Sequence, residues 1–343
     1  MADLFNLTPF ATAVYPHVDD QGRHARLLIV KGVWDLDRAD RLADGPGLLG
    51  LRDRALTLPI GDLDLEPVQR EALGEREAQE IDWMPSDAVP PKPRFDLIVS
   101  GYAHAAAGKT EHRFMAAVAH GSRIVGLTLC APRFWRRTLL QGGGGMPGEY
   151  LAAVRRVPVH PCFAYGGESA GGETLYNPQG MGSAAGHSGA GIERVALPWV
   201  EHPDHPVTDL TRHPLAAGFG PWPENAGFRL PHMGTRDLPW QRERAPHRPK
   251  DFHALFHNQA EPRLQWSRAP TPGDTIALHQ FTPEGLTRAI WPSVRPHATV
   301  GRQSAPPLVA DTCVVAPQEG RFAIVWRSIL PPAGAITVRA SNA

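Results

Sequence analysis

Residues 158–223 read PVHPCFAYGGESAGGETLYNPQGMGSAAGHSGAGIERVALPWVEHPDHPVTDLTRHPLAAGFGPWP, and 20 of these 66 residues are Gly or Pro. We call this stretch the central belt. Such a density is typical of disordered chain. However, six aromatic residues are spread through the belt: Phe163, Tyr165, Tyr176, Trp199, Phe219 and Trp222. Aromatic side chains are the surface that a chain buries first. We therefore predict that the belt is an ordered, loop-like region held by regular structure on both sides.

Short strand-like segments precede the belt. Apolar and β-branched runs on both sides of the turn at residues 19–22 predict a hairpin over residues 12–37. Three apolar runs at residues 95–105, 113–121 and 122–131 are separated by turns that contain Gly, which predicts an antiparallel meander. Residues 66–80 have a helix-forming composition with few apolar anchors, which predicts a short helix.

Helical and strand patterns return after the belt. Residues 235–244 and 249–260 predict short helices, and the apolar runs at residues 274–281, 289–296, 310–317 and 321–330 predict strands. The chain shows no βαβ alternation, which disfavours a Rossmann or TIM architecture. The predicted fold is mainly β, with antiparallel, sandwich-like sheets, a long loop-rich central region and a few short helices.

We predict a single large domain over residues 1–343 with three sub-regions. Residues 1–140 form an N-terminal β meander, and residues 141–270 form a Gly/Pro-rich central region with short helices. Residues 271–343 form C-terminal strands that pack with the N-terminal part. This arrangement follows from strand patterns at both ends of the chain with irregular sequence between them.

Charge and composition restrict the class of protein. The chain has 35 basic and 35 acidic side chains, so it lacks the basic excess of a general nucleic-acid binder. No apolar run approaches the roughly 20 residues that span a bilayer, which predicts no membrane insertion. Cys130, Cys162 and Cys313 form no CxxC pair, which suits a reducing compartment. The first residues include an early acid and no apolar core of signal-peptide length, so we expect a cytoplasmic protein.

One segment of the belt has residue types that bind metals. Glu201 is followed by His202, Asp204 and His205, and imidazoles and carboxylates are ligands that zinc accepts. His202, Asp204 and His205 are therefore candidate ligands of a metal-dependent hydrolase, although their spacing does not match HExxH. The residues themselves predict no catalytic group and no cofactor, and the hydrolase remains an alternative.

The order of several short motifs resembles a known family. The chain is similar to the domain of unknown function carried by accessory proteins of the bacterial type VI secretion system. The motif residues are Pro90, Pro91, Lys92, Pro93, Asp96, Gly101, Arg133, Trp135, Tyr165, Gly166, Gly167, Asn177, Pro178, Gly180, Gly182, Leu197, Pro198, Glu201, Pro203, Gly218, Phe219, Gly220, Pro221, Gly234, Thr235, Trp240, Pro249, Asp251, Phe252, Asn258, Ala260 and Gln265. The similarity extends over roughly residues 8–330.

The resemblance implies a cytoplasmic adaptor or chaperone and no enzyme. Such a protein holds a secreted effector and brings it to the spike, where a PAAR-type cone sits on the VgrG trimer. Because aromatic side chains supply much of the energy of protein interfaces, Tyr165, Trp199, Phe219 and Trp222 are our candidate partner-binding residues. A structural component of the secreted particle is a third possibility beside the adaptor and the hydrolase.

Overall fold

The protein is described by a computed structural model over residues 3–19, 22–137, 145–169, 172, 175–185, 187, 189–210, 212–245 and 247–342. Within these residues the fold is mainly β, with several antiparallel sheets and two short α-helices, α1 (Pro67–Leu73) and α2 (Leu238–Glu243). The predicted fold class is confirmed. No helix of the described residues is both long enough and apolar enough to cross a membrane.

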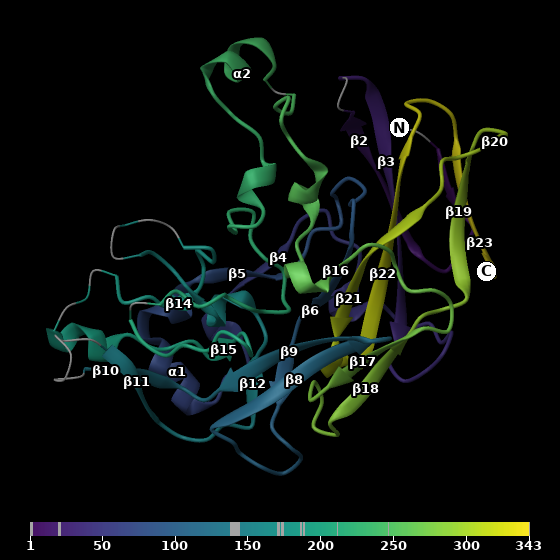
Figure 1. Ribbon diagram of the computed structural model, residues 1–343. Coiled ribbons are helices and arrows are strands. Elements are labelled where there is room, and N and C mark those ends of the chain that lie inside the picture. Colours follow the sequence, from purple (N-terminus) through teal and green to yellow (C-terminus); the bar gives the residue numbers. More distant parts are fainter. Residues whose placement is uncertain are drawn as a thin grey trace.

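The largest sheet combines strands from both ends of the chain (Figure 1). Its order is β16-β6-β21-β22-β3-β2, and β6 pairs with β21 in parallel while the other pairs are antiparallel. Its strands are β2 (Ala11–Val18), β3 (His24–Asp35), β6 (Phe95–Val99), β16 (Gln265–Trp266), β21 (Val309–Ala316) and β22 (Arg321–Leu330). Strands β6, β21 and β22 are buried along nearly their whole length, which accounts for their continuous apolar runs.

Two further sheets adjoin this one. A five-stranded antiparallel sheet has the order β15-β9-β8-β17-β18, and its strands are β8 (Arg113–His120), β9 (Arg123–Cys130), β15 (Val200–Glu201), β17 (Thr275–His279) and β18 (Leu286–Ile290). A four-stranded sheet has the order β1-β23-β19-β20, and its strands are β1 (Leu4–Asn6), β19 (Val294–Val300), β20 (Gln303–Ser304) and β23 (Ile336–Asn342). Both sheets join segments far apart in the sequence.

Short strand pairs and 3-10 turns complete the described structure. The pairs are β4 (Leu56–Pro59) with β5 (Glu80–Met84), β7 (Tyr102–His104) with β12 (Arg156–Pro158), β10 (Arg133–Arg137) with β11 (Gly145–Tyr150), and β13 (Tyr165–Gly166) with β14 (Met181–Gly182). The 3-10 turns are η1 (Gly47–Leu49), η2 (Ile60–Asp62), η3 (Gly74–Ala78), η4 (Pro161–Phe163), η5 (Gly189–Arg194), η6 (Leu230–His232), η7 (Ala254–His257), η8 (Pro262–Leu264) and η9 (Pro317–Glu319).

Most of the predicted elements form, and three are wrong. The strand predicted over residues 289–296 does not form as one element, because β18 ends at Ile290 and β19 begins at Val294. The hairpin over residues 12–37 is β2 with β3, and the helix predicted in residues 66–80 is α1 followed by η3. The predicted meander is wrong in its first part: β8 and β9 form a hairpin, but β6 lies in the six-stranded sheet beside β21. Residues 249–260 contain only the 3-10 turn η7 in place of a helix.

Five of the six aromatic residues of the belt are buried, and Tyr176 is 38 % exposed. Phe163 stacks on Trp199 with ring centroids 4.9 Å apart, and Phe219 lies 6.0 Å from Phe281 of the C-terminal part. A backbone hydrogen bond from Val99 N–H to Phe219 O attaches the belt to β6, and one from Phe219 N–H to Val159 O joins the two ends of the belt. The single-domain division stays a prediction, and its boundary at residues 140 and 141 lies outside the described residues.

Candidate functional site

An open groove of about 1070 Å³ lies between α1 and the first half of the belt. One wall is formed by residues 71–76 and Gln79, and the opposite wall by residues 166–169 and 178–183. We call this cavity the belt groove. Small-molecule pockets have volumes of about 300–1,000 Å³. The belt groove is at the upper end of that range and has room for a segment of another polypeptide.

The belt wall of the groove depends on glycines that permit close backbone approach. β13 and β14 form a parallel pair in which Gly166 lies opposite Gly182. A Cβ atom on Gly180 would lie 2.6 Å from the Cα of Gly166, and a Cβ atom on Gly166 would lie 1.9 Å from the carbonyl oxygen of Asn177. No side chain fits at either glycine, so these two motif residues are explained by packing.

Asn177 fixes the turn between the two strands. Its side chain is buried, and Nδ2 donates to the carbonyl oxygens of Pro161 at 2.7 Å and Tyr165 at 3.2 Å. Its own carbonyl oxygen accepts from Gly167 N–H at 2.9 Å and from Gly180 N–H at 3.1 Å. This motif residue therefore shapes the groove without being exposed in it.

Arg76 joins the two walls of the groove. Its Nη2 donates to the carbonyl oxygens of Cys162 at 3.1 Å and Gln179 at 3.0 Å. Burial lowers the pKa of Arg76. The guanidinium is thus used to bind backbone, and the sequence analysis gave it no role.

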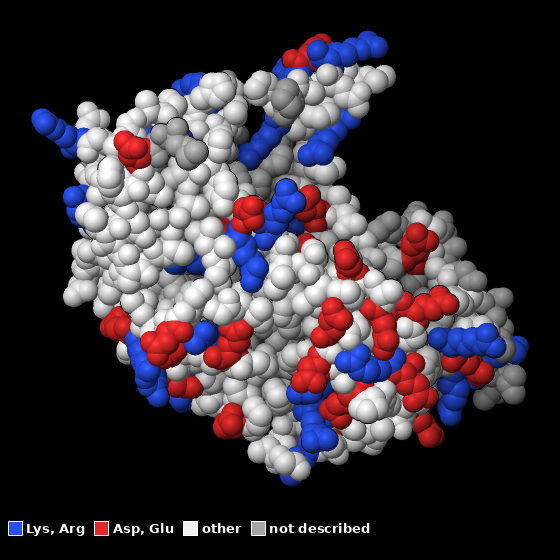
Figure 2. All heavy atoms as spheres, turned by 180° about the vertical axis from the view of Figure 1, so that it is seen from behind, with Lys and Arg blue, Asp and Glu red and all other residues white. Residues whose placement is uncertain are grey.

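The wall that contains α1 is acidic. Its segment, residues 62–80, carries seven acidic side chains and two arginines: Asp62, Asp64, Glu66, Glu71, Glu75, Glu77, Glu80, Arg70 and Arg76. Arg70 donates to the backbone carbonyls of Gly61 and Leu63, so both arginines contact main-chain oxygens. Figure 2 shows acidic side chains with basic ones among them on the lower part of the molecule seen from behind. The exposed side chains of Glu71, Glu75 and Glu168 line the groove together with one exposed arginine, Arg194. Acidic groups are therefore in excess, which favours a cationic or polar partner segment.

The aromatic residues predicted to bind a partner are buried. Trp199 and Phe219 are fully buried, and Trp222 is 1 % exposed. Tyr165 is 8 % exposed, and its hydroxyl lies 2.8 Å from His213 Nδ1. Partner binding by these residues remains untested, but their rings stabilise the core in this structure and present no aromatic surface to a partner.

The candidate metal ligands form a small turn. His202 Nδ1 accepts from the backbone N–H of Asp204 at 3.2 Å, and the rings of His202 and His205 lie 4.9 Å apart. The Asp204 side chain is 85 % exposed. Within the described residues no three His, Cys, Asp or Glu side chains are grouped so that they could hold a metal ion. The segment acts as a capped turn, and no observation favours the hydrolase.

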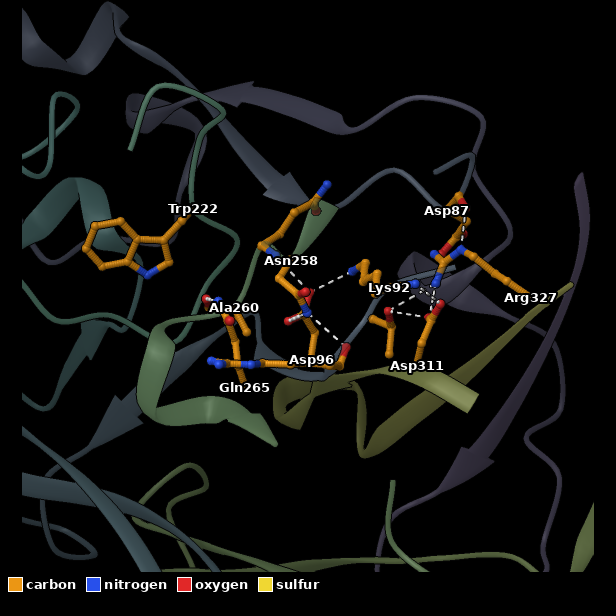
Figure 3. A network of polar contacts seen from close by, with 12 residues as sticks. Asp87, Lys92, Asp96, Trp222, Asn258, Ala260, Gln265, Asp311 and Arg327 are labelled. Carbon is orange, nitrogen blue, oxygen red and sulfur yellow. Dashed lines mark hydrogen bonds and ion pairs between the residues drawn. The ribbon is translucent and has the colours of Figure 1, made fainter. Parts of the chain in front are cut away.

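A buried network of charges connects residues from four regions of the chain (Figure 3). Lys92 Nζ lies 2.7 Å from Asp96 Oδ2, and Asp96 Oδ1 accepts from Asn258 Nδ2 at 2.7 Å. Arg327 forms an ion pair with Asp311, whose Oδ2 accepts from the backbone N–H of Lys92 at 3.0 Å. All four charged side chains are at most 1 % exposed. The motif residues Lys92, Asp96 and Asn258 thus meet here.

A third ion pair extends the network. Lys31 Nζ lies 2.8 Å from Asp87 Oδ2, and Arg327 Nε donates to the carbonyl oxygen of Asp87 at 3.0 Å. Burial lowers the pKa of Lys31 although Asp87 opposes the shift. Burial likewise lowers the pKa of Lys92 and raises the pKa of Asp311. For these three groups burial is the largest cause of the shift, and the opposite charges beside them reduce it.

The motif residues Ala260 and Gln265 lie beside this network. Gln265 Nε2 donates to the carbonyl oxygen of Ala260 at 2.8 Å. Gln259 N–H donates to Asp96 Oδ2 at 2.8 Å, and the carbonyl oxygen of Gln259 accepts from Trp222 N–H at 2.9 Å. The network therefore attaches the end of the belt to β6. The sequence analysis missed Lys31, Asp87, Asp311 and Arg327, because an isolated charged residue carries no local signal that it is buried.

Another motif pair forms a smaller buried cluster. Arg133 forms an ion pair with Glu201, and its guanidinium lies over the Tyr150 ring at 5.2 Å. Burial raises the pKa of the neighbouring Cys130 thiol to about 12. The Cys130 thiol is therefore protonated and unreactive at neutral pH.

The protein is mainly β, and its motif residues form buried contacts and line one wall of an open groove. A family model described as an uncharacterized protein conserved in bacteria (DUF2169) matches residues 21–327. The chain belongs to this family. No curated protein and no solved structure matches the chain. The family description names no activity and no secretion system.

Proposed function

We propose that the protein is an adaptor or chaperone of type VI secretion that binds a secreted effector and helps to load it onto the VgrG/PAAR spike. The resemblance of the ordered motifs supports this proposal. The observation that carries it furthest is the belt groove, because one wall is lined by the motif segments at residues 166–167 and 178–182. A groove of this size with rigidly packed glycines can hold a polypeptide segment.

The test is co-purification from cells that express the tagged protein together with the proteins encoded by neighbouring genes. We expect an effector, PAAR or VgrG protein among those retained. The double variant Glu71→Lys with Glu75→Lys reverses two exposed groove charges and should reduce the recovered partner. Glu80→Lys is the matched control, because Glu80 is exposed in the same acidic segment but does not line the groove.

Two outcomes would count against the adaptor. Retention of none of the neighbouring proteins would remove its support, and equal retention by the groove variant and by the control would move the binding site away from the belt groove. Stoichiometric zinc in elemental analysis of the purified protein would instead favour the hydrolase alternative.

A further inference from the structure

A second cavity, separate from the belt groove, has a volume of about 350 Å³. Its lining comes from four places in the chain: residues 92–95 before and in β6, residues 267–271, residues 291–295, and residues 308–311 with Trp326. We call it the arginine pocket, after Arg94, Arg268 and Arg295 in its lining. It is within the size range of cavities that bind small ligands or one or two residues of a peptide.

The walls of the arginine pocket are aromatic. Phe95, Trp291 and Trp326 contribute to its lining and are 2 %, 5 % and 4 % exposed. The rings of Phe95 and Trp291 meet edge to face, with centroids 5.6 Å apart. The apolar side chains of the lining that a ligand can contact are Val309, which is 50 % exposed, and the half-buried Val294 and Leu308.

The charges that line the pocket are mainly positive. Arg94, Arg268 and Arg295 are exposed, and none of them forms an ion pair with an acidic side chain among the described residues. Asp311 is the acidic residue of the lining, and its carboxylate already binds Arg327 and the backbone N–H of Lys92. The field in the pocket therefore favours an anion.

We propose that the arginine pocket binds a carboxylate attached to an apolar body. The guanidinium groups bind the carboxylate, and Val294, Leu308 and Val309 contact the apolar part. Two kinds of ligand carry such a carboxylate: a free aromatic acid and the C-terminal residue of another polypeptide. A nucleic acid is disfavoured, because the three rings are almost completely buried and offer no platform on which successive bases could stack. The inference does not depend on the adaptor proposal.

The experiment titrates the full chain with three probes and follows binding by calorimetry and tryptophan fluorescence. The probes are 3-phenylpropanoate, the peptide acetyl-Gly-Gly-Phe with a free carboxylate, and the same peptide as its amide. We expect the acid or the free peptide to bind with an affinity that falls as NaCl is raised, and the amide to bind at least about tenfold more weakly. Tighter binding of the peptide identifies a C-terminus, and equal or tighter binding of 3-phenylpropanoate identifies a free acid.

Substitutions at the rim locate the site. Arg268→Ala and Arg295→Ala should each weaken binding by about tenfold, because each removes a charge-assisted hydrogen bond. Arg242→Ala is the control, because Arg242 is also exposed and forms no ion pair among the described residues but lies in α2, outside the pocket. Unchanged urea midpoints would show that all three variants are folded. Failure of both carboxylates to bind, equal binding of the amide, or indifference to both rim substitutions would overturn the proposal.

Discussion

Lys92→Met tests the buried charge network at its centre. The substitution keeps an unbranched side chain of similar length and removes the ammonium that lies 2.7 Å from Asp96. Neither side chain of this pair is exposed to solvent, so Asp96 would be left as a buried carboxylate without its cation. Breaking a buried ion pair in this way costs about 3–5 kcal/mol. We expect a value near 3 kcal/mol, because Asp96 keeps its hydrogen bonds from Asn258 and Gln259.

The chain contains a matched control for this experiment. Asp19 and Arg23 form an ion pair with the same sequence separation and the same 2.7 Å distance, but the Arg23 side chain is 71 % exposed. An exposed pair of this kind contributes about 0–1 kcal/mol. Arg23→Met should therefore lower the free energy of unfolding by less than about 1 kcal/mol.

Urea unfolding followed by tryptophan fluorescence measures both variants, with linear extrapolation to zero denaturant. A double variant, Lys92→Met with Asp96→Asn, measures the coupling between the two partners. We expect the cost of the double variant to be smaller than the sum of the two single costs by at least about 1 kcal/mol, because the double variant leaves no unpaired charge. Equal costs for Lys92→Met and Arg23→Met would refute the conclusion that burial of this network controls stability.

Three further predictions follow from the packing. Gly180→Ala should destabilise the protein by about 2 kcal/mol or more, since its Cβ would lie 2.6 Å from the Cα of Gly166. Gly121→Ala has open space around its Cβ and should cost only about 1 kcal/mol, for its positive φ. Urea midpoints of the two variants measure this difference. Burial lowers the pKa of His160 from 6.5 to about 4. Between these two pH values the unfolded chain therefore binds a proton at His160 and the folded chain does not. The free energy of unfolding should therefore fall by about 1.4 kcal/mol per pH unit from pH 6.5 to pH 4 through this residue, and His160→Phe should show a shallower slope in that window. The three cysteines, Cys130, Cys162 and Cys313, are buried. Their thiols should resist Ellman's reagent in the native protein and react once urea unfolds it. Rapid labelling of the native protein would contradict their burial.

Local sequence patterns predicted the strand segments well because a buried strand needs a short apolar run. The run at residues 321–330 coincides with β22, and the turn chemistry near residue 20 lies between β2 and β3. Pairing partners were harder to predict. β6 pairs in parallel with β21, more than 200 residues later in the chain, and nothing in its own five residues specifies that neighbour.

The candidate site was predicted only in part for a related reason. The Gly and Asn-Pro motifs predicted a fixed backbone path, and the structure shows the close contacts that require it. The four aromatic residues predicted to bind a partner are buried, and ring type does not distinguish a core position from an interface position, since both bury apolar surface. The opposite wall of the groove comes from residues 71–76 and Gln79, and no local sequence pattern predicts that they lie beside the belt.

The sequence by itself determined that this chain forms short strands, that its belt is rich in turns, and that its total charge is balanced. Only the tertiary structure decided which charges are buried. Asp19 with Arg23 and Lys92 with Asp96 are alike in the sequence, yet one pair lies in water and the other in the core. The physical reason is that the dielectric environment of a charge depends on everything packed around it, and here Asn258, Asp311 and Arg327 come from distant parts of the chain.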